Sequence, residues 1–149
     1  MRIWVDADAC PRPVKDILFR VSERTGLAVI LVANHALPTP ALATVSSVQV
    51  ASGFDAADNY IVQHIEANDL LISSDIPLAA EVLEKAAFVL TPRGEAYTLD
   101  NIKARLTMRN FMEEMRASGE HSGGPAPFSN ADKAQFANTL DRLIAKRRL

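Results

Sequence analysis

The sequence has little of the chemistry that disulfide-linked and zinc-finger proteins use. Among 149 residues there is one cysteine, Cys10, and there are three histidines, which are well separated. A single cysteine excludes an intramolecular disulfide, and with so few histidines it also excludes a Cys/His zinc cluster of the finger type. Any metal ion would therefore be held by oxygen ligands.

Long apolar runs and abundant aromatic residues are also missing. No segment approaches the roughly 20 apolar residues that cross a bilayer, so we expect no contact with a membrane. Asp6 and Asp8 interrupt the N-terminal segment where a signal peptide requires apolar residues, which predicts a cytoplasmic protein. Aromatic residues make up 6% of the chain, which indicates core packing rather than a base-stacking platform for single strands.

Charge is distributed unevenly along the chain. Residues 1–100 carry 13 acids and 7 bases, a net charge of −6, whereas residues 101–149 carry 9 bases and 5 acids, a net charge of +4. The basic C-terminal part has two interpretations. It is either a solvated surface with cations at a helix end, or a surface that meets a polyanion such as nucleic acid.

Hydrophobic patterning predicts an α/β fold, with a parallel sheet between helices on both faces. The run Leu27–Ala33 is uninterrupted and apolar, as in strands buried on both sides. We expect one domain over 1–149, with 99–149 as a C-terminal helical extension packed on it. The expected strands are 2–5, 27–33, 45–50, 69–74 and 87–90, and the expected helices are 11–26, 55–66, one that starts at 75, 99–117 and one that opens with a capping box at 129–132.

Aspartates follow two of the predicted strands directly. Asp6 and Asp8 follow the first strand and Asp75 follows the fourth, while Asp55 and Asp58 open the helix before the fourth strand. If the strand order reverses between these two strands, the carboxylates converge at the carboxyl edge of the sheet, where open α/β sheets bind ligands.

Clustered carboxylates repel one another and need a proton or a cation to coexist. Mg²⁺ and Mn²⁺ prefer oxygen ligands, and Mg²⁺ typically combines one or two carboxylates with waters and substrate phosphate. Such a site supports metal-assisted phosphodiester hydrolysis. The alternative is that each aspartate caps a helix, which applies to Asp8, Asp55, Asp58 and Asp75 more readily than to Asp6.

Six separated motifs occur in order along the chain. They are Val5–Pro11, Gly53–Asp58, Asp69–Ala79, Pro92–Glu95, Arg105–Arg109 and Gly123–Pro125. Together they resemble the bacterial YaiI/YqxD family, from the first residues to the last predicted helix. That family is regarded as PIN-like, which implies a parallel sheet with an acidic metal site and relation to metal-dependent nucleases.

The resemblance assigns a role to each acid. Asp6 resembles the first PIN acid, Asp58 resembles the acid at the start of the helix before the fourth strand, and Asp75 resembles the acid of the Thr/Ser-x-Asp motif. Asp8 is an extra acid of this family's opening motif that can substitute for a ligand. The glutamate that PIN nucleases carry in their middle helices has no counterpart that we can place.

Three arginines are candidates for binding phosphate. Arg93 follows the fifth strand, where its guanidinium can reach the same edge of the sheet, and Arg105 and Arg109 share one face of a predicted helix. Surface ion pairs and a solvated helix face are the alternatives. Cys10 is not expected to act as a nucleophile, and the histidines are expected in loops or on the surface.

The leading hypothesis is therefore an Mg²⁺- or Mn²⁺-dependent nuclease acting on RNA, with Asp6, Asp8, Asp58 and Asp75 as catalytic and metal-binding residues. Asp6-x-Asp8 also loosely resembles haloacid-dehalogenase phosphatases, but no lysine lies between Lys15 and Lys85 to complete that pattern. A PIN-like domain that binds RNA or protein without catalysis is the alternative from another class. Apolar residues on the surface could form the contacts of a homodimer, so a homodimer is also expected to be possible.

Overall fold

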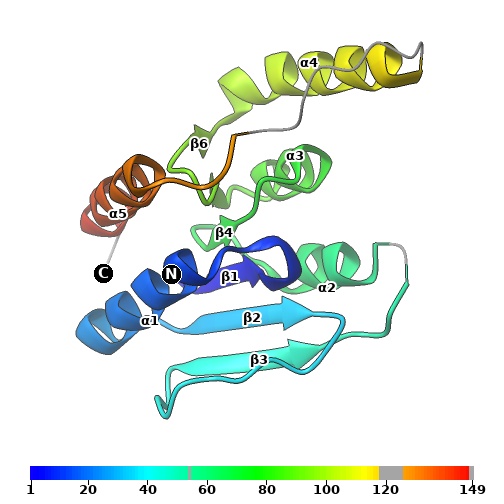
Figure 1. Ribbon diagram of the computed structural model, residues 1–149. Coiled ribbons are helices and arrows are strands. Elements are labelled where there is room, and N and C mark those ends of the chain that lie inside the picture. The colour runs from blue at the N-terminus through cyan, green and yellow to red at the C-terminus, as the bar shows by residue number, and fades with distance from the viewer. Residues whose placement is uncertain (54, 118–125, 148–149) are drawn as a thin grey trace.

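The computed structural model contains one six-stranded sheet (Figure 1). It describes residues 1–53, 55–117 and 126–147. The sequence predicts a loop rich in glycine, proline and serine over 118–128, of which residues 118–125 lie outside the described part. The strand order is β3-β2-β1-β4-β5-β6, and all neighbours are parallel except β5 and β6. The strands are β1 Ile3–Asp6, β2 Val29–Ala33, β3 Val45–Gln49, β4 Leu70–Ile72, β5 Phe88–Leu90 and β6 Ala96–Tyr97. The predicted α/β class is confirmed.

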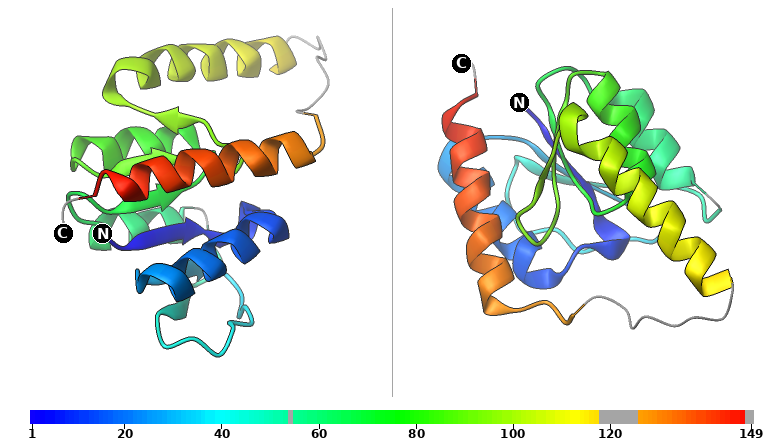
Figure 2. Two further views of the ribbon diagram at one scale, coloured as in Figure 1. Left: turned by 90° about the vertical axis from the view of Figure 1, so that its left-hand side faces the viewer. Right: turned by 90° about the horizontal axis from the view of Figure 1, so that it is seen from above.

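Helices cover both faces of this sheet (Figure 2). The core on one face combines β-strand residues with α1 and α5, and the core on the other combines them with α2 and α3, against which α4 packs. The 3₁₀ turn η1 follows β1 directly. The helices are η1 Ala7–Ala9, α1 Arg12–Thr25, α2 Ala56–His64, α3 Ile76–Glu84, α4 Leu99–Ala117 and α5 Asn130–Ala145. No helix in the described part of the chain is long and apolar enough to cross a membrane.

The last helix, α5, is part of the main core. Its N-terminus is the predicted capping box, in which Ser129 and Asp132 hydrogen-bond to each other's backbone amides. Phe136 and Leu140 are fully buried, and Ile144 is nearly so, against residues of β1 and α1. The division into a domain and a helical extension stays a prediction, but the apolar face of α5 is continuous with the core beneath the sheet.

The tight turn between β5 and β6 joins the sheet to both C-terminal helices. Arg93 forms an ion pair with Asp132 at the start of α5, with Nη1 and Oδ2 3.0 Å apart. Glu95 forms an ion pair with Arg105 of α4. Between them, Gly94 lies directly against the backbone of α5. This turn, which β6 follows, was not predicted as a structural connection.

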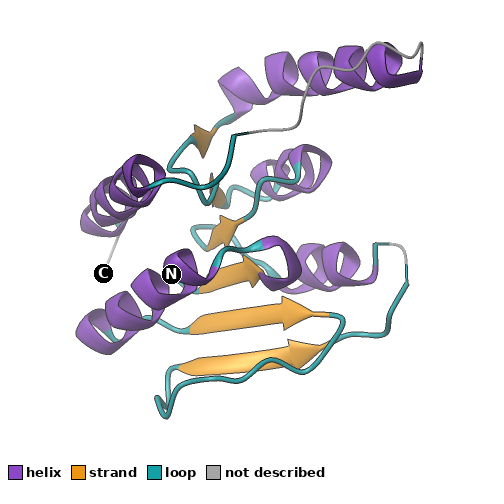
Figure 3. Ribbon diagram, viewed as in Figure 1, coloured by secondary structure: helices purple, strands orange, loops and turns teal. Residues whose placement is uncertain are grey.

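The strand order changes direction between β1 and β4. These strands pair in parallel, with Val5 opposite Ile72, but the chain continues from β1 toward β2 and from β4 toward β5. The loops that leave the two strands therefore diverge at the carboxyl edge of the sheet (Figure 3). This confirms the expected reversal. Asp6 is the last residue of β1, whereas β4 ends at Ile72, earlier than the predicted 69–74, so that Asp75 lies three residues beyond this neighbouring strand.

Candidate acidic site at the carboxyl edge of the sheet

Asp6 and Asp75 are linked through Ser73. The Ser73 hydroxyl donates a hydrogen bond to Asp6 Oδ2 over 3.0 Å and accepts one from the Asp75 backbone amide, also over 3.0 Å. Asp75 then caps α3, because its Oδ1 accepts the Leu78 amide proton. The side chains at the ends of β1 and β4 are therefore held in one connected network.

Asp58 approaches the same network from the first turn of α2. The pKa of Asp58 is raised to about 7, mainly by burial and then by the carboxylates of Asp75, Asp6 and Asp55, together with a hydrogen bond to Asp75. Carboxyl groups crowded in this way coexist when they take up a proton or a cation. Asp6, Asp58 and Asp75 are called the acid cluster below.

Asp6 is affected by the same surroundings. Burial raises its pKa, the hydrogen bond from Ser73 lowers it, and the negative charges of Asp75 and Asp8 raise it. The net direction is upward. The acid cluster thus concentrates negative charge in a partly dry site, which attracts protons and cations.

Asp8 faces a different neighbour. Its Oδ2 accepts the backbone amide proton of Asn34 over 3.0 Å, and its Oδ1 lies 2.9 Å from Nδ1 of His35. Both partners follow β2, so the Asp8 side chain is held toward the β2 side of the edge, whereas Asp75 lies on the β4 side. Asp8 acts on Asp6 through its charge.

The capping alternative applies to one of these aspartates. Asp75 is a true N-cap, but the Asp55 side chain makes no capping hydrogen bond although it stands at the N-cap position of α2. The N-cap of α1 is Pro11, so Asp8 does not cap that helix. Asp58 lies inside α2, beyond the cap position. Capping alone therefore does not explain the acid cluster.

A groove of about 530 Å³ runs from Asp75 along α4. Arg105 and Arg109 both line this groove, in agreement with the prediction that they share one face of the helix. Arg105 is paired with Glu95, and Arg109 is paired with Glu113 one turn later, 3.1 Å away. Both pairs are partly exposed, so exchange of the glutamate for a phosphate group costs little.

Arg93 does not share this groove. Its guanidinium donates to Asp132 and to the backbone carbonyl of Ala126, and it lines a second pocket next to the acid cluster. Arg93 is therefore anchored to the segment that leads into α5.

Sequence reasoning missed two contributors to this edge. Ser73 stands two residues before Asp75, and its spacing in Ser73-Ser74-Asp75 was the available signal. His35 was expected to be a loop residue without a partner motif, and its contact with Asp8 joins residues 27 positions apart. Pairing of that kind follows from the adjacency of β1 and β2, which no local pattern encodes.

The arrangement does not by itself form a complete metal cage. Across residues 1–53, 55–117 and 126–147, no three His, Cys, Asp or Glu side chains lie in the arrangement of a preformed metal site. Mg²⁺ commonly takes one or two carboxylates and completes its shell with waters and substrate phosphates. One or two members of the acid cluster are enough to supply those carboxylates.

Removal of the Asp58 charge is expected to stabilise the protein at alkaline pH. The pKa of Asp58 is about 7 in the folded chain against 3.8 for an ordinary aspartate, so the folded state binds this proton more tightly. Its stabilising contribution is complete below pH 3.8 and is lost as the pH rises through 7. Asp58→Asn keeps a hydrogen-bond donor for Asp75 and removes the charge. Because Asp58 is partly exposed and screened by solvent, we expect the substitution to raise the free energy of unfolding by about 1 kcal/mol at pH 8. At pH 4 the free energy of unfolding should change little.

Urea unfolding at pH 4, 6 and 8 measures this difference. Asp141→Asn is the matched control, because Asp141 lies on α5 in an exposed ion pair with Arg24. A gain in Asp58→Asn that does not grow with pH would contradict the charge crowding of the acid cluster.

Comparison of the sequence with known proteins identifies the family of this chain. The family described as "Uncharacterized BCR, YaiI/YqxD family" matches residues 4–146. A UPF0178 protein of Hahella chejuensis is 60% identical over 98% of this chain and 97% of its own length. UPF0178 proteins of Aliivibrio fischeri MJ11 and Shewanella sp. MR-4 are each 58% identical, over 100% and 97% of both chains respectively. No solved structure matches the chain. Because the agreement covers nearly every residue, the chain belongs to the YaiI/YqxD family.

Proposed function

We propose that this protein hydrolyses phosphodiester bonds of nucleic acid, with RNA as the expected substrate, in a reaction that depends on Mg²⁺ or Mn²⁺. The observation that carries this proposal is the convergence of Asp6, Asp58 and Asp75 at the strand-order reversal, where Ser73 links Asp6 to Asp75 and the charges of both raise the pKa of Asp58. Such crowded carboxyl groups are stabilised by a divalent cation. The resemblance of Asp6, Asp58 and Asp75 to the acids of PIN nucleases also supports this proposal, and the PIN-like relationship is itself part of it.

The chemistry of the donor set fits a hard divalent ion. All ligand groups of the acid cluster are carboxyl oxygens, and burial together with the neighbouring carboxylates raises the pKa of Asp6 and of Asp58. A bound divalent cation would supply charge neutralisation for a phosphodiester and would make a nearby water more acidic. We assign its binding to the acid cluster, with one or two of Asp6, Asp58 and Asp75 as direct ligands and the remainder acting through water, and with Asp8 contributing charge from the β2 side.

The arginines of α4 have a separate task in this proposal. Arg105 and Arg109 line the groove that begins at Asp75, so they hold phosphates of a strand that lies along α4. Their glutamate partners keep the groove nearly neutral until a phosphate replaces them. A homodimer stays a prediction.

Cleavage of labelled RNA and DNA tests the proposal directly. Single- and double-stranded forms are incubated with Mn²⁺, Mg²⁺ or chelator. Asp6→Asn and Asp75→Asn preserve shape, and asparagine retains the cap of α3. We expect metal-dependent cleavage, and each substitution should reduce it by about 100-fold or more, because even the partners of metal ligands are worth about 10–100-fold.

Asp141→Asn is the control here too, and it should cleave like the wild type. Cleavage that survives in folded Asp6→Asn/Asp75→Asn would contradict the proposal. RNA binding without metal that Asp75→Asn leaves intact or strengthens, with no cleavage by any variant, would favour the binding-domain alternative.

A further inference from the structure

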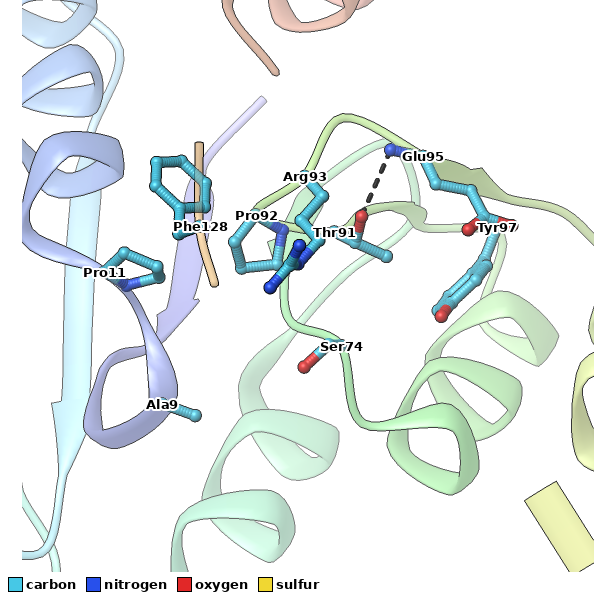
Figure 4. A pocket seen from close by; sticks show the side chains of 9 residues that line it. All are labelled: Ala9, Pro11, Ser74, Thr91, Pro92, Arg93, Glu95, Tyr97 and Phe128. Atoms are coloured by element: carbon cyan, nitrogen blue, oxygen red, sulfur yellow. Dashed lines mark hydrogen bonds between the residues drawn. The ribbon is translucent and has the colours of Figure 1, made fainter. Parts of the chain in front are cut away.

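A second pocket opens beside the acid cluster at the strand-order reversal (Figure 4). Its volume is about 370 Å³, near the lower end of small-molecule sites, which span about 300–1,000 Å³. It is bounded by the segments that follow β1, β4 and β5 and by the segment that leads into α5. The lining residues are Ala9, Pro11, Ser74, Thr91, Pro92, Arg93, Glu95, Tyr97 and Phe128.

The charges around this pocket are already paired. Arg93 is held by Asp132 and by the carbonyl of Ala126, and Glu95 is held by Arg105. The pocket therefore carries no surplus positive charge with which to attract a phosphate. A neutral group enters it with less desolvation cost than an ion does.

Three planar groups from separate segments line the pocket. They are the Phe128 ring before α5, the Arg93 guanidinium after β5 and the Tyr97 ring in β6. Figure 4 shows Arg93 between Phe128 and Tyr97 in that view. Aromatic rings and guanidinium planes are the surfaces on which unstacked nucleobases lie. The hydrogen bonds to Asp132 and Ala126 hold the Arg93 plane in place before any ligand arrives.

Polar groups are present for the edge of a flat ligand. The Ser74 side chain is exposed at the pocket, and the Thr91 hydroxyl accepts the Glu95 amide proton over 3.1 Å. A hydroxyl that accepts one hydrogen bond still has a proton to donate. Apolar walls with a few such groups suit a heterocycle that has both faces and edges to bind.

The pocket and the groove along α4 meet at two shared lining residues, Ser74 and Tyr97. A base in the pocket therefore places its sugar and phosphate toward Asp75 and the groove. We propose that this pocket binds one nucleobase of the nucleic-acid strand, using Phe128 and Arg93 as stacking surfaces. This inference rests on the proposed function and gives Phe128 a role beyond the core packing that the sequence predicts for the aromatic residues.

Calorimetric titration with nucleotides tests the pocket without cleavage. AMP and UMP are the probes, ribose 5-phosphate is the probe without a base, and chelator is present throughout. Phe128→Leu keeps an apolar side chain but removes the flat ring, whereas Phe128→Tyr keeps the ring. Phe111→Leu makes the same change at an exposed position of α4, where Phe111 is 52% exposed.

We expect AMP or UMP to bind the wild type, Phe128→Tyr and Phe111→Leu alike, and Phe128→Leu to bind about tenfold more weakly. Ala9→Leu, which enlarges a side chain of the pocket lining, should also weaken binding and serves if Phe128→Leu does not fold. Absence of nucleotide binding, or equally tight binding of ribose 5-phosphate, would overturn the proposal.

The two proposals fail in different ways. Nucleotide binding that depends on Phe128, with no metal-dependent cleavage, supports the pocket and refutes the nuclease. Metal-dependent cleavage with no nucleotide binding and equal rates in wild type and Phe128→Leu supports the nuclease and refutes the pocket. Asp6→Asn/Asp75→Asn should retain nucleotide binding, because neither residue lines the pocket.

Discussion

Phe136→Ala is expected to lower the free energy of unfolding by about 3–5 kcal/mol, the usual cost of truncating a buried phenylalanine. Phe136 is fully buried and packs with residues of β1 and α1 on one face of the sheet. Its removal leaves a cavity between α5 and the sheet, and the surroundings can close it only in part. Equilibrium unfolding in urea measures the loss.

The same substitution at Phe111 isolates the effect of burial. Phe111 lies on α4 and is 52% exposed, so Phe111→Ala should change the unfolding free energy by about 0.5 kcal/mol or less. If the two variants were equally stable, α5 would not be a structural part of the core. That result would favour an α5 that is dispensable for the fold.

Gly94→Ala is expected to lower the free energy of unfolding by about 2–5 kcal/mol, because it combines backbone strain with overpacking. Gly94 has φ +90°, a conformation that L side chains rarely adopt, and a Cβ there would lie 2.6 Å from backbone atoms of Gln135 and Phe136. These neighbours belong to α5 and cannot rotate aside. The substitution therefore pushes the β5–β6 turn away from α5.

Two other glycines separate the causes. Gly26 ends α1 with φ +76°, but nothing lies within 4 Å of an added Cβ, so Gly26→Ala measures strain alone. Gly53→Ala meets neither obstacle and should be nearly neutral. We expect the loss in unfolding free energy to increase from Gly53→Ala to Gly26→Ala to Gly94→Ala. A loss at Gly94 no larger than that at Gly26 would show that α5 yields to the turn.

Most of the fold could be predicted from local patterns. The apolar run at 27–33 contains β2, Gly26 ends α1 in the left-handed conformation, and Ser129 with Asp132 forms the capping box. These features depend on residues close together in sequence. The strand β6 was missed because two residues carry no periodicity, and its place depends on the turn that precedes it.

The site was predictable to a different extent. The placement of Asp6 and Asp75 on neighbouring strand ends follows from topology, which the alternation of strands and helices indicated. The partners of Asp8, Arg93 and Arg105 were not predictable, because each ion pair joins segments that meet only in the folded chain. Local sequence identifies which groups are chemically able to pair, whereas the packing of α4 and α5 decides which of them do.

The position of α5 also has a consequence for the nascent chain. A ribosome makes β1 and α1 well before Phe136, so the apolar surface that α5 covers has no partner until α5 has been made. At about 5–20 residues per second, that surface stays uncovered for roughly 10 s. During this interval it offers chaperones a binding surface and neighbouring nascent chains a route to aggregation. The arrival of α5, rather than the formation of any early strand pair, is then the event that closes the core.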